Sequence, residues 1–476
     1  MYIAFLYAYF TWLALQNFLL PLAYQQGWLS AASVGVLMAG KEVVMVLALL
    51  ALGYRAFQKG WRFNAADKFA LAYAALLVLY LVFAPLTMGA TVPFFIRAVS
   101  LRYLIALVVF YFWGRLSFLE MGELRGLVRF IVALQIGVAL FGIFEWSFLP
   151  LSFWRDTVGA GVFMTDVKGL PEGINVFDGL PINMVRSDIR RSISTYGDPL
   201  AMGIACVFPL LLCLAWLLQE KNSALGAKRR RWWMALTAIG VGLLLTNGRE
   251  SIAATLLGLV LLAAWAGKAK SLVVPALVAV TAILTIPSVW GHIMDTVTFR
   301  EGSAQYHLGY LQSGWNEAPK LIVGKGLGEA GGWGASLAGV ESDVGENSYF
   351  ELMGQAGLLS VVLLVGFLVA IHKQARWFSG RIPDKLIAAA LAATAANIAG
   401  RLVMAVFSPS FFAVIPMASF FFLCGAMFTT LQRLGLKPGM VFRPAALYAR
   451  DGLGRLRKLV PRGAMHVLPS ERGAET

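Results

Sequence analysis

Long uninterrupted runs of apolar residues constrain this chain more than any other feature of its sequence. The stretch from Ser251 to Trp265 contains no charged residue, and runs of similar character recur along most of the chain. Backbone N–H and C=O groups inside hydrocarbon must find their partners within the same segment, so such runs predict membrane-spanning helices. A transmembrane β-barrel would instead alternate apolar and polar residues at a period of two, which these runs do not.

The composition agrees with this interpretation. Charged residues make up 14% of the 476 residues and hydrophobic residues 59%, whereas a soluble chain carries about a quarter charged residues. The sequence therefore predicts an all-α fold, a polytopic transmembrane helical bundle of about 12 spans. The expected spans are residues 2–23, 32–53, 68–88, 92–115, 125–148, 197–218, 232–247, 249–267, 271–290, 347–371, 386–406 and 410–431.

The formal net charge of +15 is carried by loops rather than by one basic face. Basic residues cluster in four short connections, at 55–68, 221–231, 268–270 and 373–385, and again after Arg433. Every second connection is therefore positive, and the positive-inside rule predicts that both termini lie in the cytoplasm. This placement indicates membrane orientation and contact with anionic lipid, and does not favour nucleic acid as a partner.

Two long connections interrupt the expected single transmembrane domain of residues 1–432. They lie on the external side, at about 149–196 and 291–346, and loops longer than about 15 residues are usually functional or disordered. Both are rich in glycine, aromatic and charged residues, so the chemistry of the protein is expected there. Residues 433–476 are expected to form a basic cytoplasmic tail on anionic headgroups, and the N-terminal apolar run is expected to be a retained span.

Two arginine-bearing segments are predicted on the external face. Arg190 and Arg191 precede a turn that leads into a span, and Arg249 lies between two apolar runs. Guanidinium groups bind phosphate oxygens through a bidentate fork that lysine lacks. Two such segments on one side of the membrane point to capture of a diphosphate. The simpler alternative for Arg249 is a turn residue that snorkels to the interface.

The second external connection carries two candidate general bases. Glu346 lies where the polar loop meets a hydrophobic span, where a carboxylate can accept a proton from an attacking hydroxyl. His307, earlier in the same connection, is the second candidate base. The alternative role for Glu346 is capping of the following helix, and the alternative for His307 is that of a polar surface residue. Asn347 and Tyr349 follow Glu346 directly and are candidates to line the same cavity.

Charged residues also fall inside the expected spans, where they are costly and face the bundle interior by default. Lys41 and Glu42 are adjacent in the second span, and we expect this pair to neutralise itself in a structural or cavity-lining position. Arg97 and Arg102 lie in the external half of the fourth span. They either add positive charge to an external cavity or snorkel to the interface.

Four short segments occur in a characteristic order. They are Arg191 to Pro199 entering a span, Gly248-Arg249 opening a later span, Tyr310 to Gly328 with a glycine-rich end, and Glu346 to Gly357 closing the large loop. In this order, and on one side of the membrane, they resemble the bacterial O-antigen polymerase and O-antigen ligase superfamily. Two positions depart from its pattern: Glu346 stands where a histidine is usual, and His307 where an arginine is usual.

The resemblance implies a GT-C-like membrane glycosyltransferase that moves a glycan from undecaprenyl diphosphate to a sugar hydroxyl at the periplasmic face. It implies that Arg191 and Arg249 hold the diphosphate, with Arg190 beside them, and that Glu346 or His307 deprotonates the acceptor. It implies no divalent metal and no other cofactor. The implied partners are the lipid-linked glycan donor, the glycan acceptor, membrane lipids and a chain-length regulator.

Four functions stay open at this level. A polymerase would join repeat units into O-antigen, capsule or exopolysaccharide, and a ligase would transfer finished glycan to lipid A-core or another acceptor. A transporter of an anionic solute would need gated helices and a site at mid-membrane, for which Lys41 and Glu42 are the only hint, and the sequence has no clear inverted repeat. A non-catalytic membrane scaffold is the fourth alternative.

Overall fold

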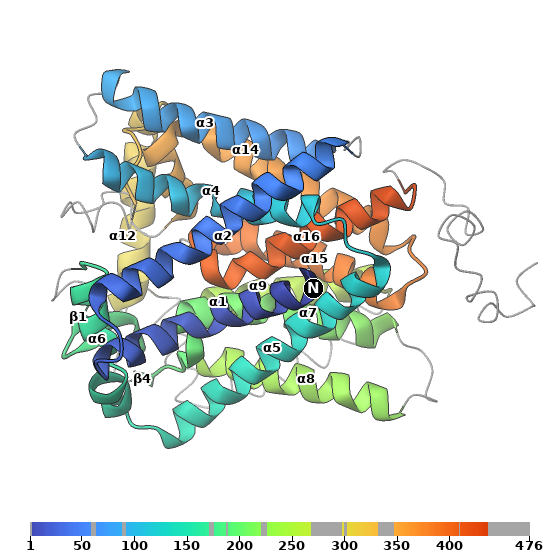
Figure 1. The fold of residues 1–476 in the computed structure, drawn as a ribbon, viewed down its shortest axis with the longest axis horizontal. Helices are drawn as coiled ribbons and strands as arrows, with labels where there is room; N and C mark the ends of the chain where they lie inside the picture. Colours follow the sequence, from blue (N-terminus) through green and yellow to red (C-terminus); the bar gives the residue numbers. More distant parts are fainter. Residues whose placement is uncertain are drawn as a thin grey trace, which may run out of the picture. The chain divides into compact units, whose positions relative to one another are not determined.

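The computed structural model describes residues 2–436 except 59–62, 88–91, 171–175, 187–188, 220–225, 268–297, 299–301, 332–346 and 409. Within these residues the chain is almost entirely helical, and nine helices are long and apolar enough to cross a membrane (Figure 1). The prediction of an all-α, multi-pass membrane protein is confirmed at this level. The nine apolar helices are α1 (Tyr2–Gln25), α2 (Ala31–Gln58), α3 (Ala65–Thr87), α4 (Phe94–Leu116), α5 (Met121–Phe148), α7 (Pro199–Gln219), α14 (Ser348–Ser379), α15 (Lys385–Met404) and α16 (Val414–Arg433).

Two further helices occupy expected spans without meeting the same criteria of length and polarity. α8 (Gly226–Leu245) begins with a basic run, and α9 (Arg249–Trp265) is shorter than a typical span. The chain breaks between α8 and α9 where the sequence predicted a break between Thr246 and Glu250. The expected span at 271–290 lies outside the described residues, so the number of spans stays a prediction.

By its contacts the chain divides into two units, Met1–Thr430 and Leu431–Thr476. All of the packing and site geometry below belongs to the first unit. Most of the expected basic tail, from residue 437 onward, lies outside the described residues.

Close helix packing in this bundle depends on glycine where α4 meets α16. A Cβ at Gly114 would clash with the carbonyl oxygen of Phe422, and a Cβ at Gly425 would clash with that of Tyr111. Lipid tails are as apolar as leucine, so helices in a membrane associate mainly through such close van der Waals contact. Trp113 packs edge-on against Phe422 beside this crossing, at a centroid distance of 5.5 Å.

A buried ion pair joins α3 to α4. Arg115 donates through Nη2 to Asp67 at 2.6 Å and through Nε to the other carboxylate oxygen at 2.8 Å. Tyr111 donates its hydroxyl to the same carboxylate at 2.8 Å, and both charged side chains are fully buried. The Asp67 carboxylate thus accepts hydrogen bonds from both Arg115 and Tyr111. A buried ion pair is tolerated when such additional hydrogen bonds are present.

Short elements between α5 and α7 gather at one end of the bundle, which we call the hairpin end. Helices α1, α5, α8 and α15 end there, and α2, α7, α9 and α14 begin there; β1, α6 and β4 lie beside the ends of α1 and α2 (Figure 1). Trp154, Val158 and Ile193 form a small core that packs against Phe18 of α1 and Phe141 of α5. The elements are η1 (Phe153–Thr157), α6 (Ala160–Val162), η2 (Phe163–Val167), β1 (Val176–Phe177), β2 (Leu180–Pro181), η3 (Ile182–Met184), β3 (Val185–Arg186), β4 (Ile189–Arg190) and η4 (Ser194–Tyr196).

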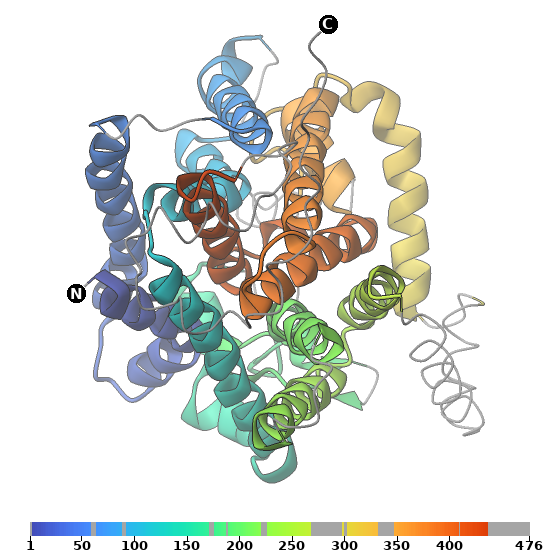
Figure 2. The same ribbon diagram turned by 90° about the vertical axis from the view of Figure 1, so that its right-hand side faces the viewer.

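Helix α14 is kinked near its start. Ala356 and Gly357 leave the helical region, and Gly357 has a φ of +74°. The segment after α12 (Gly302–Glu317) and η6 (Ala318–Leu321) fills the kink, because the N–H of Leu358 donates to Ile322 and the N–H of Lys325 donates to Gly354. α12 itself stands at the edge of the bundle, as the yellow helix at the right of Figure 2.

Candidate functional site

The turn between α8 and α9 brings together two arginine segments that are distant in sequence. Arg191 is buried, and its Nε donates to the carbonyl oxygen of Thr246 at 2.8 Å, while the neighbouring N–H of Ser192 donates to Leu245 at 2.9 Å. The cationic side chain therefore sits at the carboxyl end of α8, where the helix dipole favours positive charge. Three residues after Thr246, Arg249 begins α9.

Arg249 occupies the first position of α9 and is half-buried. A cation at this position adds to the partial positive charge of the helix N-terminus rather than offsetting it, which makes the place attractive to an anion. Helix α7 approaches closely, because a Cβ at Gly203 would lie 2.8 Å from Ser251 Oγ and 3.3 Å from Thr246 Oγ1. Arg191 and Arg249, the two arginines predicted to bind diphosphate, are thus both placed at the turn between α8 and α9.

Arg190 faces a different neighbour from Arg191. Its Nη2 donates to the backbone carbonyl of Glu145 at 2.8 Å and lies 3.7 Å from the carboxylate of the same residue. Glu145 is buried and also accepts hydrogen bonds from Trp154 Nε1 at 2.7 Å and from the N–H of Ile193 at 3.1 Å. The geometry makes Arg190 and Glu145 a clamp between α5 and the chain that carries Arg191.

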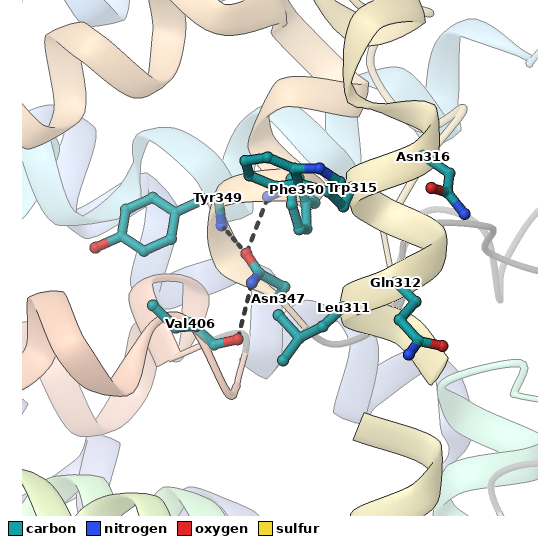
Figure 3. Close-up of a pocket in the computed structure, with 8 residues that line it drawn as sticks. All are labelled: Leu311, Gln312, Trp315, Asn316, Asn347, Tyr349, Phe350 and Val406. Carbon is teal, nitrogen blue, oxygen red and sulfur yellow. Dashed lines mark hydrogen bonds between the residues drawn. The ribbon is translucent and has the colours of Figure 1, made fainter. Parts of the chain in front are cut away.

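An open pocket of about 650 Å³ lies between α12 and the start of α14 (Figure 3). Asn347 caps α14 by accepting from the N–H groups of Tyr349 at 2.9 Å and Phe350 at 3.1 Å, and its amide donates to Val406 at 2.8 Å. The walls combine aromatic and amide side chains, a mixture that can stack on a sugar ring and hydrogen-bond its hydroxyls. The lining residues are Leu311, Gln312, Trp315, Asn316, Asn347, Tyr349, Phe350 and Val406.

The two candidate bases belong to the connection that leads into α14. His307 lies on α12, one turn before the pocket-lining Leu311, but its side chain is outside the described part of the structure. Glu346 is itself outside the described residues. Helix α14 is capped by Asn347, the residue directly after Glu346.

The charged residues of α2 and α4 are arranged differently from the expectation. Glu42 pairs with Arg102 of α4 at 3.0 Å, and Lys41 donates to Gln16 of α1 at 3.3 Å. Glu42 thus forms its ion pair with Arg102 of the neighbouring helix rather than with Lys41, because consecutive residues of a helix point in different directions. Arg97 lies apart from them, since its guanidinium donates to the carbonyls of Val92 and Leu81.

Lys168 and Asp198 join this charged region, and sequence reasoning did not single them out. Burial lowers the pKa of the Lys168 ammonium to about 8, Lys41 and Arg102 lower it further, and Asp198 raises it. Burial raises the pKa of Asp198, against the opposing effects of two backbone N–H groups at the start of α7 and of Arg191. Each residue lies in a polar stretch of the chain, where the sequence gives no sign that the fold will partly bury the charge.

Arg401 of α15 is a third residue that the sequence analysis missed, although the sequence held a signal for it. It is almost fully buried, its Nη2 donates to Ile204 at 3.1 Å, and Nε and Nη1 have no hydrogen-bond partner among the described residues. Asn397, one turn away on the same helix, is equally buried and has no described partner for its amide. A charge within an apolar run is a functional candidate by default, and the rule that selected Lys41 applies equally here.

Comparison with known proteins adds no assignment. Neither the family models nor the curated proteins that were searched contain a match to this chain. The class that the fold defines is a multi-pass helical membrane protein with a cationic, partly buried site at its hairpin end.

Proposed function

We propose that this protein is a glycosyltransferase that takes its glycan from a lipid diphosphate carrier and joins lipid-linked repeat units into O-antigen, capsule or exopolysaccharide. The observation that carries the proposal is the bond between Arg191 and Thr246, which places Arg191 and Arg249 at one turn. When the anomeric bond breaks, negative charge grows on the leaving diphosphate. Guanidinium groups already fixed in a poorly hydrated site stabilise that charge without reorganising.

The pocket between α12 and α14 supports the second half of the reaction. Trp315 and Tyr349 offer aromatic surface, and Gln312 and Asn316 offer amides to the hydroxyl groups of an acceptor sugar. In this proposal a base from the same connection removes the proton of the attacking hydroxyl. Glu346 and His307 are the candidates that the chain offers for that role.

The proposal also specifies the setting of the reaction. The bundle would have about 12 spans and a GT-C-like architecture in a bacterial inner membrane, with both termini in the cytoplasm and the hairpin end in the periplasm. The donor would be a glycan linked to undecaprenyl diphosphate, and no metal or cofactor takes part. A chain-length regulator would be a partner of the polymerase.

Substitution of Arg249 by lysine tests the diphosphate role. Lysine keeps the charge but loses the bidentate fork, so turnover of a lipid-linked repeat unit by the purified protein should fall by about 100-fold or more. The matched control is Arg155→Lys, because Arg155 is an arginine of η1 that pairs with Asp156 and Asp178 on the surface. Near-normal turnover in Arg249→Lys would remove the arginine from the proposed mechanism.

Polymerase and ligase share this donor chemistry and differ in the acceptor. Deletion of the gene, followed by gel analysis of the surface polysaccharide, separates them. Single repeats retained on lipid A with loss of long chains would indicate the polymerase, whereas long chains accumulating on the lipid carrier would indicate the ligase. Unchanged surface glycan would contradict both.

A further inference from the structure

Arg401 carries a positive charge inside the bundle, about one turn before α15 ends at the hairpin end. It is 1% exposed, its Nη2 donates to the carbonyl oxygen of Ile204, and its guanidinium carbon lies 5.7 Å from the ring centroid of Phe420. Nε and Nη1 have no hydrogen-bond partner among the described residues. In the same part of the chain no carboxylate pairs with Arg401, and the ionisable group that acts on its charge is the thiol of Cys424. Arginine keeps its proton even in apolar surroundings.

The cations near the turn between α8 and α9 differ from Arg401, because they share their surroundings with carboxylates. Arg249 is followed by Glu250 at the start of α9. The charges of Arg191 and Lys168 both act on Asp198, which stands just before α7. The positive charge of these residues is therefore partly offset at the place where a diphosphate would bind.

Close helix packing joins Arg401 to that turn. A Cβ at Gly400 would lie 2.6 Å from the carbonyl oxygen of Ala254, so α15 crosses α9 at this point. Ala254 follows Arg249, the first residue of α9, by about 8 Å along the helix. Because α7, α9 and α15 pack directly against one another, protein rather than water separates Arg401 from the turn. The separation is roughly 10 Å.

A buried charge acts over such a distance because the protein interior screens it weakly. The attraction between two unit charges about 10 Å apart changes affinity by about tenfold or more at an effective dielectric constant of about 20, and by only about twofold in bulk water. A buried arginine without a carboxylate partner lowers the stability of the folded protein. An anion bound at the turn would recover part of that cost through its attraction to Arg401.

We propose that Arg401 is a supporting charge that makes the turn between α8 and α9 selective for a prenyl diphosphate over a prenyl monophosphate or a prenyl alcohol. The inference rests on the proposed function, because it takes this turn as the diphosphate site. Arg401 does not touch the diphosphate and acts through the protein interior. Its charge is therefore what matters, whereas Arg249 acts through the fork of its guanidinium group.

Isothermal titration calorimetry of the full-length protein in a neutral detergent tests this role, with farnesyl diphosphate, farnesyl monophosphate and farnesol as probes. Arg401→Met should bind the diphosphate more weakly than the wild type by about tenfold or more. Binding of the monophosphate should weaken less, and binding of farnesol should not change. Arg401→Lys, which keeps the charge, should bind the diphosphate nearly as well as the wild type. Equal weakening of all three probes in Arg401→Met would show a structural role and overturn the inference.

Arg381→Met is the matched control for the loss of one positive charge. Arg381 is exposed and follows α14 at the end of the bundle opposite the hairpin end, where it donates to the carbonyl oxygen of Trp377. This variant should bind all three probes as the wild type does. Weakening of the diphosphate in Arg381→Met to the same extent as in Arg401→Met would mean that net charge, rather than the position of Arg401, decides affinity.

The variant Arg249→Gln separates this inference from the proposed function. Weaker diphosphate binding in Arg249→Gln, together with wild-type binding in Arg401→Met, would overturn the role of Arg401 and leave the proposed function standing. Wild-type binding in Arg249→Gln, or no diphosphate binding by the wild type, would overturn the turn as the site and with it the role of Arg401. Charge-selective binding that depends on both arginines, without turnover of a lipid-linked repeat unit, would overturn the proposed glycosyl transfer alone.

Discussion

Two buried arginines of this protein experience opposite chemical surroundings. Arg115 is locked to Asp67 by two hydrogen bonds of 2.6 and 2.8 Å. Arg401 is just as buried, but it meets one backbone carbonyl and the face of Phe420, with two of its nitrogens lacking a hydrogen-bond partner among the described residues. A buried charge is tolerated while its partner is present, whereas a buried charge without a partner lowers the stability of the folded protein.

This contrast predicts changes of stability with opposite signs. Arg115→Met leaves Asp67 as an uncompensated buried charge and should destabilise the protein by about 3–5 kcal/mol. Arg401→Met removes a buried charge that has no ion-pair partner in the described part of the chain, and it should raise the midpoint of thermal unfolding by at least about 2 °C. Differential scanning fluorimetry in detergent measures both. A lower midpoint for Arg401→Met would mean that Arg401 has a partner that stabilises it.

At the scale of elements, the kink of α14 is the feature that shapes the pocket end of the bundle. Gly357 has a φ of +74°, and a Cβ there would lie 2.7 Å from the carbonyl oxygen of Ile322 and 2.8 Å from that of Val323. Both the backbone angle and the space exclude a larger residue. The segment that enters the kink joins α12 to α14, so the kink positions both walls of the pocket.

Gly357→Ala should therefore destabilise the protein by about 1–3 kcal/mol. Gly380 provides the control at the other end of the same helix, because its φ is −85° and nothing lies within 4 Å of an added Cβ. Gly380→Ala should be neutral. The fraction of monodisperse protein after heating, measured by size-exclusion chromatography, reports both variants, and an unaffected Gly357→Ala would contradict the role of the kink.

At the scale of the whole molecule, the loop charges predict which end faces which compartment. The native cysteines Cys206, Cys213 and Cys424 are buried and free, so introduced cysteines can be labelled against a low background. We expect Arg155→Cys, at the hairpin end, to react with a membrane-impermeant maleimide in cells whose outer membrane has been permeabilised. Lys228→Cys, in the basic start of α8, should react only after lysis.

Labelling of Lys228→Cys in unlysed cells would reverse the orientation predicted by the positive-inside rule. It would also move the Arg191–Arg249 turn to the cytoplasm. The proposed transfer at the periplasmic face would then fail, even with the helical bundle unchanged.

The sequence by itself determined that the chain is a helical membrane protein and where most of its long helices lie. It did so because hydrocarbon penalises every unsatisfied backbone group and every charge. The positions of the membrane-spanning helices and of their ends can therefore be predicted from the local polarity of the sequence. The break before Arg249 and the candidate arginines at the ends of helices followed from the same local rule. That rule also applied to Arg401 and Glu145, which lie inside apolar runs of the sequence.

Only the tertiary structure decided which of these charges meet. Glu42 pairs with Arg102 rather than with Lys41, and Arg191 reaches the turn at Thr246. Lys168 is held against the ring of Phe163, which packs on α1 and α2. Partners of this kind are separated by tens of residues along the chain. Helix rotation and close packing select them, and neither is encoded in the polarity of a single segment.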